Sequence, residues 1–294
     1  MDKTLLSVGH GYSAQALATV LRSEGWTVIG TTRSADKARA LEREGIEALI
    51  WPGQPLPLER ATHLLSSVGP EAGCDPVLAR EAAALEGARH LRWVGYLSTT
   101  GVYGDQGGGW VDESTPCTPV TARGRARLQA ESEWQALARR TGVALHVFRL
   151  AGIYGPGRGP FAKLRAGRAQ QVIKPGQVFS RIHVDDIAQV LAASIRTPDP
   201  GAIYNVCDDD PAPPQDVLAY AAQLLGVPAP PQVPFEQAEL SAMARSFYAD
   251  NKRVRNDRIR NELRVRLRYP DYRSGLAAVL RAEATKAPSE SAQG

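Results

Sequence analysis

The sequence predicts an α/β protein with a doubly wound parallel sheet and a smaller carboxy-terminal α/β lobe. Short apolar runs alternate with stretches whose apolar residues recur at helical spacing, which indicates a sheet covered by helices on both faces. This alternation ends at a glycine- and proline-rich segment, residues 155–160, and proline-rich loops interrupt the chain beyond it. A chain of 294 residues is long enough for one large domain with an added lobe.

The predicted strands are short and mostly apolar. Residues 4–8 form the first strand and lead directly into a glycine, which is typical of a buried parallel strand. The strands expected after it are residues 27–31, 48–50, 63–66, 93–97, 144–150 and 203–206. Residues 144–150 are rich in apolar side chains on both faces, so we expect helices to cover this strand on both sides.

Helices are predicted between these strands. The first begins near Ser13 and ends at Gly25, where a left-handed backbone is easily adopted. Ser34 is a suitable cap for the second helix, which extends to about Glu44. The further helices are expected at residues 76–86, around Trp134, at 187–195 and at 217–225. This order of elements is that of a doubly wound sheet.

A glycine-rich motif stands between the first strand and the first helix. Glycines in such a turn let the backbone approach a pyrophosphate, whose charge the helix N-terminus stabilises. An alanine in the last position still permits the helix to pack closely on the strand. The motif predicts a Rossmann-type dinucleotide site, with a tight turn of no further function as the alternative. Its cofactor-binding residues are Gly9, His10, Gly11, Tyr12, Ser13 and Ala14.

The end of the second strand bears on the choice of cofactor. Sites selective for NAD usually place a carboxylate there to bind the ribose 2′-hydroxyl, whereas residues 31–34 read Thr-Thr-Arg-Ser. A guanidinium and hydroxyl groups suit a 2′-phosphate, which a carboxylate would repel. Arg33 and Ser34 therefore favour NADP, with NAD as the other candidate. The alternative for Arg33 is an exposed arginine at a helix start.

Four segments resemble the extended short-chain dehydrogenase/reductases, also called the NAD-dependent epimerase/dehydratase family. They read LSTTGVYG from Leu97, RLAGIYGPG from Arg149, IHVDDI from Ile182 and YNV from Tyr204, in the family's order. The resemblance spans nearly the whole chain. It implies an NAD(P)-binding Rossmann domain over residues 1–155 and a substrate lobe mainly over 156–286, with core elements near 183–206 returning to the first domain. We expect residues 287–294 to be a disordered tail.

The chain departs from this family at the catalytic pair. The family uses Tyr-x-x-x-Lys, and the resemblance places Arg123 at the tyrosine and Arg127 at the lysine. An arginine stays protonated, so Arg123 cannot transfer a proton, whereas Arg127 could still bind the hydroxyls of the nicotinamide ribose. Thr99 matches the residue that holds the reacting oxygen. Tyr103 is the candidate proton donor, with a buried tyrosine under a loop as the alternative.

Two functions follow from the resemblance. One is an NADP-preferring oxidoreductase or epimerase for a small polar or nucleotide-linked substrate, and the other is a non-catalytic dinucleotide-binding or redox-sensing protein. The family's dehydratases carry Asp-Glu where this chain has Thr100 and Gly101, which argues against sugar-nucleotide dehydration. The resemblance also suggests a homodimer. It adds to the cofactor-binding residues Ser66, Ser98 and Ile153.

Composition bears on several other classes of protein. With 43% hydrophobic and 22% charged residues, the chain is not of the disordered class. Three widely spaced cysteines offer neither a disulfide framework nor a metal site. The first residues lack the pattern of a signal peptide and no stretch is apolar enough to span a bilayer, so we expect a cytoplasmic protein without membrane contact. Residues 252–268 hold eight basic and two acidic residues. We interpret them as a solvated helix face, with nucleic-acid binding as the less favoured alternative.

Overall fold

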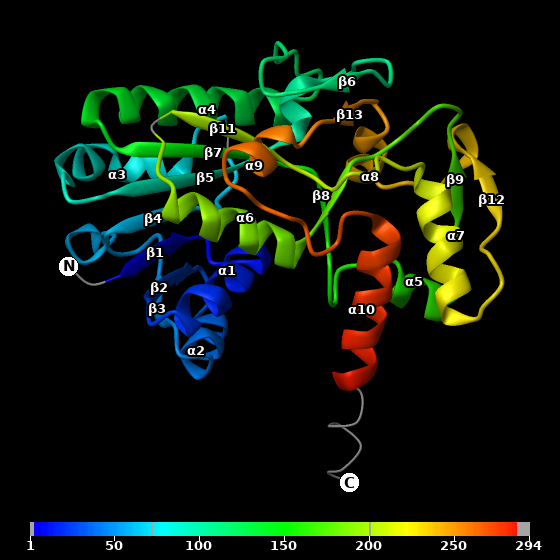
Figure 1. Ribbon diagram of the computed structural model, residues 1–294, viewed down its shortest axis with the longest axis horizontal. Coiled ribbons are helices and arrows are strands. Elements are labelled where there is room, and N and C mark those ends of the chain that lie inside the picture. Colours follow the sequence, from blue (N-terminus) through cyan, green and yellow to red (C-terminus); the bar gives the residue numbers. More distant parts are fainter. Residues whose placement is uncertain (1–2, 72, 200, 287–294) are drawn as a thin grey trace, which may run out of the picture.

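A computed structural model describes residues 3–71, 73–199 and 201–286 (Figure 1). Within these ranges the central sheet has seven strands, all parallel, in the order β11-β7-β5-β4-β1-β2-β3. The strands are β1 (Thr4–Val8), β2 (Thr27–Thr32), β3 (Glu47–Ile50), β4 (His63–Ser66), β5 (Trp93–Thr99), β7 (Ala144–Leu150) and β11 (Ala202–Val206). The order reverses between β1 and β4, which confirms the predicted doubly wound sheet.

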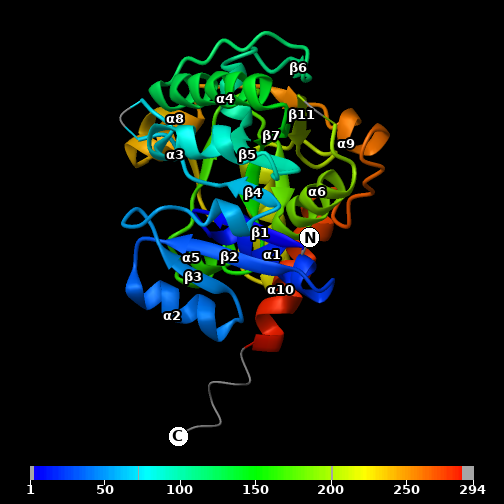
Figure 2. The same ribbon diagram turned by 90° about the vertical axis from the view of Figure 1, so that its left-hand side faces the viewer.

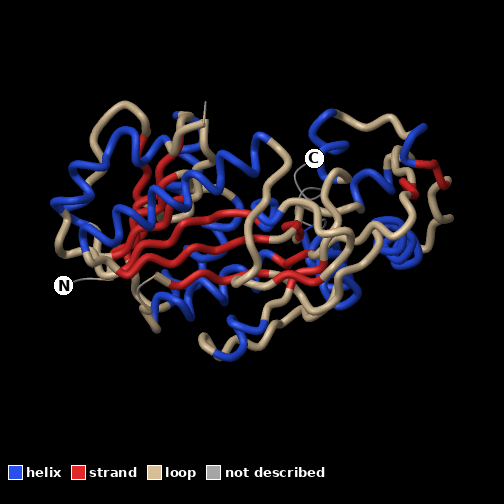
Figure 3. Tube along the Cα trace, turned by 90° about the horizontal axis from the view of Figure 1, so that it is seen from above, coloured by secondary structure: helices blue, strands red, loops and turns tan. Residues whose placement is uncertain are grey.

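Helices cover both faces of this sheet (Figures 2 and 3). Because side chains alternate along a strand, Leu5 of β1 packs with one layer of helices and Leu6 with the other. The first layer holds α1 (Tyr12–Ser23), α2 (Ala35–Arg43) and α6 (Val184–Arg196). The second holds α3 (Pro76–Gly87) and α4 (Ala122–Thr141). The predicted helices thus lie where two apolar faces of the sheet must be buried.

A second lobe lies beyond the carboxyl ends of the strands (Figure 1). Its strand pairs are β8 (Gly152–Tyr154) with β10 (Arg181–His183), and β9 (Gln171–Ile173) with β12 (Gln232–Pro234). Its helices are α5 (Phe161–Arg165), α7 (Pro214–Leu225), α8 (Ala242–Phe247) and α10 (Tyr272–Lys286). Phe161, Ala221, Leu276 and Val279 are fully or almost fully buried between α5, α7 and α10, which gives this lobe a core of its own.

The basic segment 252–268 is not the solvated helix face that we expected. It forms β13 (Arg253–Val254), which pairs with β6 (Trp110–Val111), and the short helix α9 (Asp257–Asn261). Ile259 of α9 joins the core of the main sheet. Several of its arginines form ion pairs: Arg255 with Asp257, Arg258 with Glu262, Arg260 with Asp209 and Arg268 with Asp185. The basic charge of this segment is therefore partly balanced by acidic neighbours.

The described residues include no helix with the length and apolar character needed to cross a membrane. They also bring together no three His, Cys, Asp or Glu side chains that could hold a metal ion. The expected tail, residues 287–294, lies outside the described residues. The cytoplasmic location and the homodimer stay predictions.

Candidate functional site

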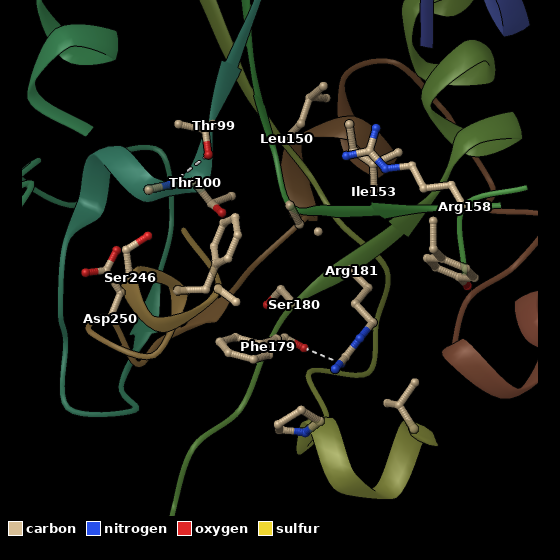
Figure 4. A pocket seen from close by; sticks show the side chains of 18 of the residues that line it. Thr99, Thr100, Leu150, Ile153, Arg158, Phe179, Ser180, Arg181, Ser246 and Asp250 are labelled. Atoms are coloured by element: carbon tan, nitrogen blue, oxygen red, sulfur yellow. Dashed lines mark hydrogen bonds between the residues drawn. The ribbon is translucent and has the colours of Figure 1, made fainter. Parts of the chain in front are cut away.

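A cavity of about 1160 Å³ lies between the main sheet and the second lobe. On the sheet side it is lined by the glycine motif, the carboxyl ends of β5 and β7, and the first turn of α4. On the other side β9, β10, α7, α8 and α10 contribute side chains (Figure 4). The carboxyl edge of a doubly wound sheet is where such folds bind ligands.

The glycine motif has the geometry of a phosphate cradle. Gly9 has a φ of +76°, and a Cβ added there would lie 2.8 Å from the Cγ2 of Val68, so a side chain would both strain the backbone and clash. Its N–H donates to the Oγ1 of Thr31 at 2.8 Å. Gly11 directly precedes α1 and lines the cavity, so the N-terminus of this twelve-residue helix faces the cavity. This shape fits the pyrophosphate of a dinucleotide.

The other residues of the motif divide into two groups. Tyr12, Ser13 and Ala14 line the cavity, and the hydroxyl of Tyr12 donates to the carbonyl of Pro156 at 3.0 Å. Burial raises the pKa of Tyr12 to about 12. His10 differs, because its ring lies under β2, 2.9 Å from the position of a Cβ on Gly30, and does not line the cavity. His10 is therefore not placed to contact a cofactor in this cavity, which corrects its prediction as a cofactor-binding residue; its backbone N–H also already donates to the carbonyl of Thr31 at 2.9 Å.

The buried ring of His10 makes the fold sensitive to acid. Its nitrogens have no hydrogen-bond partner, and burial, with a smaller effect of Lys37, lowers its pKa to about 4. The unfolded chain has an ordinary histidine pKa near 6.5, so it binds a proton between these values that the folded chain does not. We expect the free energy of unfolding to fall as pH drops from about 6.5 to 4. Urea unfolding across this range should show a shallower fall for His10→Gln; an unchanged slope would contradict the assignment.

Besides His10, three further predicted cofactor residues lie outside the cavity lining. Arg33 and Ser34 follow β2, where Ser34 caps α2 as predicted and Arg33 forms an exposed ion pair with Glu71 at 3.2 Å. Ser66 is fully buried, and its hydroxyl has no hydrogen-bond partner. The next residue, Ser67, lines the cavity with a buried and equally unpartnered hydroxyl, so the structure favours Ser67 over Ser66 as a ligand contact.

The end of β5 carries Ser98 and Thr99, and both line the cavity. Thr99 is half-buried, and its Oγ1 accepts from the N–H of Gly101 at 3.1 Å, which begins the short helix η2 (Thr100–Tyr103). The oxygen thus lies at the carboxyl edge of the sheet, where the resemblance placed the group that holds the reacting oxygen. Ile153 of β8 also lines the cavity. Contact of Ser98 and Ile153 with a cofactor stays a prediction.

Tyr103 is not placed to transfer a proton to a ligand in this cavity. Its side chain is fully buried, and its hydroxyl donates to Asn205 at 2.8 Å and accepts from Arg149 at 2.9 Å. Burial raises the pKa of Tyr103 to about 12. Arg149 also forms a buried ion pair with Glu131 at 2.8 Å. The tyrosine belongs to a buried polar network, which corrects our prediction that it is the proton donor.

Three guanidinium groups line the cavity near the motif. Arg123 and Arg127 lie one turn apart in α4, and Arg158 lies over the ring of Tyr12 at 5.7 Å. Burial, together with the charges of Arg127 and Arg158, lowers the pKa of Arg123. Arg127 donates to the carbonyl of Leu97 in β5. Within the described ranges, none of the three forms an ion pair with a carboxylate, which makes this part of the cavity a place for an anion.

The cavity contains a buried ion pair that the sequence analysis did not identify. The ammonium of Lys252 is 3.1 Å from the Oδ2 of Asp250 and donates to the carbonyl of Gly104 at 2.9 Å. Both side chains line the cavity, and the other oxygen of Asp250 is buried without a hydrogen-bond partner. Burial lowers the pKa of Lys252. Figure 4 shows Asp250 on the same side of the cavity as Thr99.

Comparisons with known proteins agree with this geometry. The family model described as "NAD dependent epimerase/dehydratase family" matches residues 78–207. Protein YeeZ of Escherichia coli (strain K12) is 30% identical, over 92% of this chain and 97% of that protein. A 3-diazoavenalumate denitrifying reductase from Streptomyces sp is 27% identical, over 93% of this chain and 99% of that protein.

The fold is equally well matched. The structure of a functionally unknown conserved protein from Silicibacter pomeroyi DSS is 60% identical with a TM-score of 0.92, covering 95% of this chain and 99% of that one. The dTDP-glucose 4,6-dehydratase from Bacillus anthracis str. Ames, in complex with NAD, has a TM-score of 0.78 at 15% identity, over 96% of both chains. Human epimerase family protein SDR39U1, with NADPH, has a TM-score of 0.72 at 17% identity, over 95% of this chain and 99% of that one. The chain belongs to the NAD-dependent epimerase/dehydratase family.

Proposed function

We propose that the protein is an NAD(P)-dependent oxidoreductase, reductase-like or epimerase-like, that prefers NADP and acts on a small polar substrate. One observation carries the proposal: a single cavity joins the glycine cradle, the Thr99 hydroxyl and a set of unpaired cations. The dinucleotides in the complexes of the dehydratase and of SDR39U1, and the reductase relative, support it. The carbonyl or carbinol carbon of the substrate would lie near Thr99.

The residues of the cavity have distinct roles in this proposal. The cradle at Gly9 and Gly11 binds the pyrophosphate, and the Arg127 guanidinium binds the hydroxyls of the nicotinamide ribose. When bound, the nicotinamide supplies or accepts the hydride. The Thr99 hydroxyl donates a hydrogen bond to the reacting oxygen and so stabilises the negative charge that develops there.

The proton is supplied by Lys252 in this proposal. Of its three N–H groups, one donates to Gly104 and one to Asp250, which leaves one for a ligand. Burial lowers its pKa and brings the ammonium closer to the range in which an acid is effective. Gly104 ends the helix η2 that begins directly after Thr99, so Lys252 lies at the same end of β5 as the Thr99 hydroxyl.

The preference for NADP rests on Arg33, which is exposed and can turn toward a 2′-phosphate from its ion pair with Glu71. We expect Arg33→Ala to weaken NADPH binding about tenfold, because a charge-assisted hydrogen bond contributes roughly 1.5–3 kcal/mol. NADH binding should change less than about twofold. Glu71→Gln, which removes the competing carboxylate, should strengthen NADPH binding. Nicotinamide fluorescence titrations of the natural protein and the two variants measure these affinities. An equal loss of affinity for both cofactors in Arg33→Ala would contradict the assignment of Arg33 to the 2′-phosphate.

Turnover is tested by NADPH oxidation with a panel of aldehydes, ketones and nucleotide sugars, with absorbance at the reduced nicotinamide band as the readout. Oxidation that depends on one member of the panel supports an oxidoreductase. Binding of NADPH with no oxidation by any member would favour the alternative, a dinucleotide-binding or redox-sensing protein. Thr99→Val keeps the shape of the side chain and removes the hydroxyl, so it should lower this oxidation.

A further inference from the structure

A wall of apolar side chains lines the cavity on the side of the second lobe. We call it the apolar wall, and its members are Val172, Val178, Phe179, Leu240, Phe247 and Tyr248. Phe247, the last residue of α8, is 54% exposed. Among the large apolar residues that are exposed in the described ranges, it is the one that lines the cavity. Since burial of an apolar ring lowers the free energy, an exposed ring inside a cavity points to a ligand.

The wall has its own support behind Phe247. The ring of Tyr248 is buried, with its centre 5.2 Å from that of Phe179 and 5.0 Å from that of Phe235. Lys174 donates to the carbonyl of Tyr248, and the guanidinium of Arg245 lies 4.9 Å from the centre of the Phe235 ring. These contacts hold α8 in place, so the wall exists before a ligand binds.

The apolar wall lies near the predicted place of the reacting carbon. Lys252 follows α8 closely in the sequence and donates to the carbonyl of Gly104 at 2.9 Å. Gly104 ends the helix η2, which begins directly after Thr99. Figure 4 shows Ser246 of α8 and Thr99 on the same side of the cavity. A substrate held at Thr99 therefore extends toward α8.

The charges around α8 favour an uncharged ligand. Arg245, the one charged residue of this helix, lies outside the cavity lining. Asp250 is already in an ion pair, and Glu239 is exposed to solvent. Arg181 borders the wall at the Phe179 ring, where two carbonyl groups accept from its Nη1.

The shape of the site favours a small molecule as the occupant. A protein partner would cover an outward face, such as that of Met243, which is 65% exposed and lies outside the cavity lining. Phe247 faces the cavity instead. The cavity volume of about 1160 Å³ exceeds the roughly 300–1,000 Å³ of most small-molecule pockets, which leaves room for a substrate beside a dinucleotide.

We propose that the apolar wall binds an uncharged apolar group of the substrate, an aryl ring or an alkyl chain, with the Phe247 ring as its principal contact. The substrate class is then an aldehyde or ketone with an apolar substituent: the polar carbonyl faces Thr99 and the substituent faces α8. This assignment of the substrate rests on the proposed function. The apolar site itself does not, because the glycine cradle lies on the sheet side of the cavity.

The test is fluorescence titration of the protein, saturated with NADPH, with Nile red, an uncharged dye whose emission rises in apolar surroundings. We expect saturable binding that Phe247→Ser weakens at least about fivefold and that Phe247→Leu largely restores, because leucine keeps an apolar side chain. Met243→Ser is the matched control: it removes an exposed apolar side chain of the same helix outside the cavity and should change the affinity less than about twofold.

Competition identifies the group that is bound. Benzyl alcohol and cyclohexylmethanol should both displace the dye, and the better competitor shows whether the wall prefers a ring that is aromatic or aliphatic. Uridine, whose base is flat but polar, should not displace it. Displacement by uridine alone would mean that the wall is a nucleotide site and would overturn the proposal.

The outcomes separate this inference from the proposed function. Equal dye affinity in the natural protein and in Phe247→Ser, or no saturable binding, would overturn the site. If NADPH does not bind, the titration is made without it, and a Phe247-dependent affinity would leave the site standing while the proposed function fails. With turnover, kcat/KM should rise about twofold to fourfold for each CH₂ from propanal to hexanal, and less in Phe247→Ser. A flat series in the natural protein would overturn the substrate class.

Discussion

Replacing Lys252 with Met is expected to lower NADPH-dependent turnover by about 10²–10⁴-fold, the range attributed to a general acid. Met has a similar length and no proton to give, so NADPH affinity should stay within about twofold. The measurement is steady-state oxidation of NADPH with an acceptor from the panel, together with a fluorescence titration of the cofactor.

The pH profile distinguishes an acid from a merely structural lysine. The ammonium form is the active one, and burial lowers the pKa of Lys252, so turnover should fall with rising pH at a lower pH than for an ordinary lysine. Lys252→Arg keeps the positive charge, but its turnover should be reduced like that of Lys252→Met, and the residual turnover should lack this alkaline limb. Full activity in Lys252→Arg would show that charge alone is needed.

Breaking the buried ion pair of Arg149 and Glu131 is expected to have the largest effect on stability. The two groups are 5% and 2% exposed, lie 2.8 Å apart, and connect Ser98, near the cavity, to Tyr103. Arg149→Met leaves the Glu131 carboxylate buried without its partner, which costs about 3–5 kcal/mol in comparable cases. Urea unfolding measures the free energy of unfolding.

Two variants control this prediction. Arg149→Met with Glu131→Gln should recover part of the loss, because no uncompensated charge remains. The exposed pair of Arg140 and Glu86 should contribute less than about 1 kcal/mol, so Arg140→Met is the surface comparison. A loss below about 1 kcal/mol in Arg149→Met would mean that the network carries little of the stability.

The sheet could be predicted from the sequence because its signals are local. Apolar runs such as residues 4–8 and 144–150, and the glycine motif placed directly after a strand, each lie within a few neighbouring residues. The second lobe offers weaker signals. Strands β8, β9, β10 and β12 have three residues each, too few to show a periodicity.

The errors at the site have a different cause. The sequence predicts correctly that Tyr103 follows the carboxyl end of β5. The orientation of its side chain, however, depends on Arg149 of β7 and Asn205 of β11, which hold its hydroxyl in the interior. The pair of Lys252 and Asp250 reaches the cavity because β13 pairs with β6, more than 140 residues earlier in the sequence. Local sequence patterns do not show such contacts, so the glycine turn at the end of β1 could be predicted and the pair of Lys252 and Asp250 could not.

Fluorescence titration of the purified protein with NADPH and with NADH tests most directly whether this cavity binds a nicotinamide dinucleotide. The structure leads us to expect saturable binding of both, with NADPH the tighter, because the cradle at Gly9 and Gly11 serves either cofactor and Arg33 serves only the 2′-phosphate. Gly9→Val, whose side chain would clash with Val68, should abolish the signal while the protein stays folded by circular dichroism. Failure of the natural protein to bind either dinucleotide would contradict a dinucleotide site in this cavity.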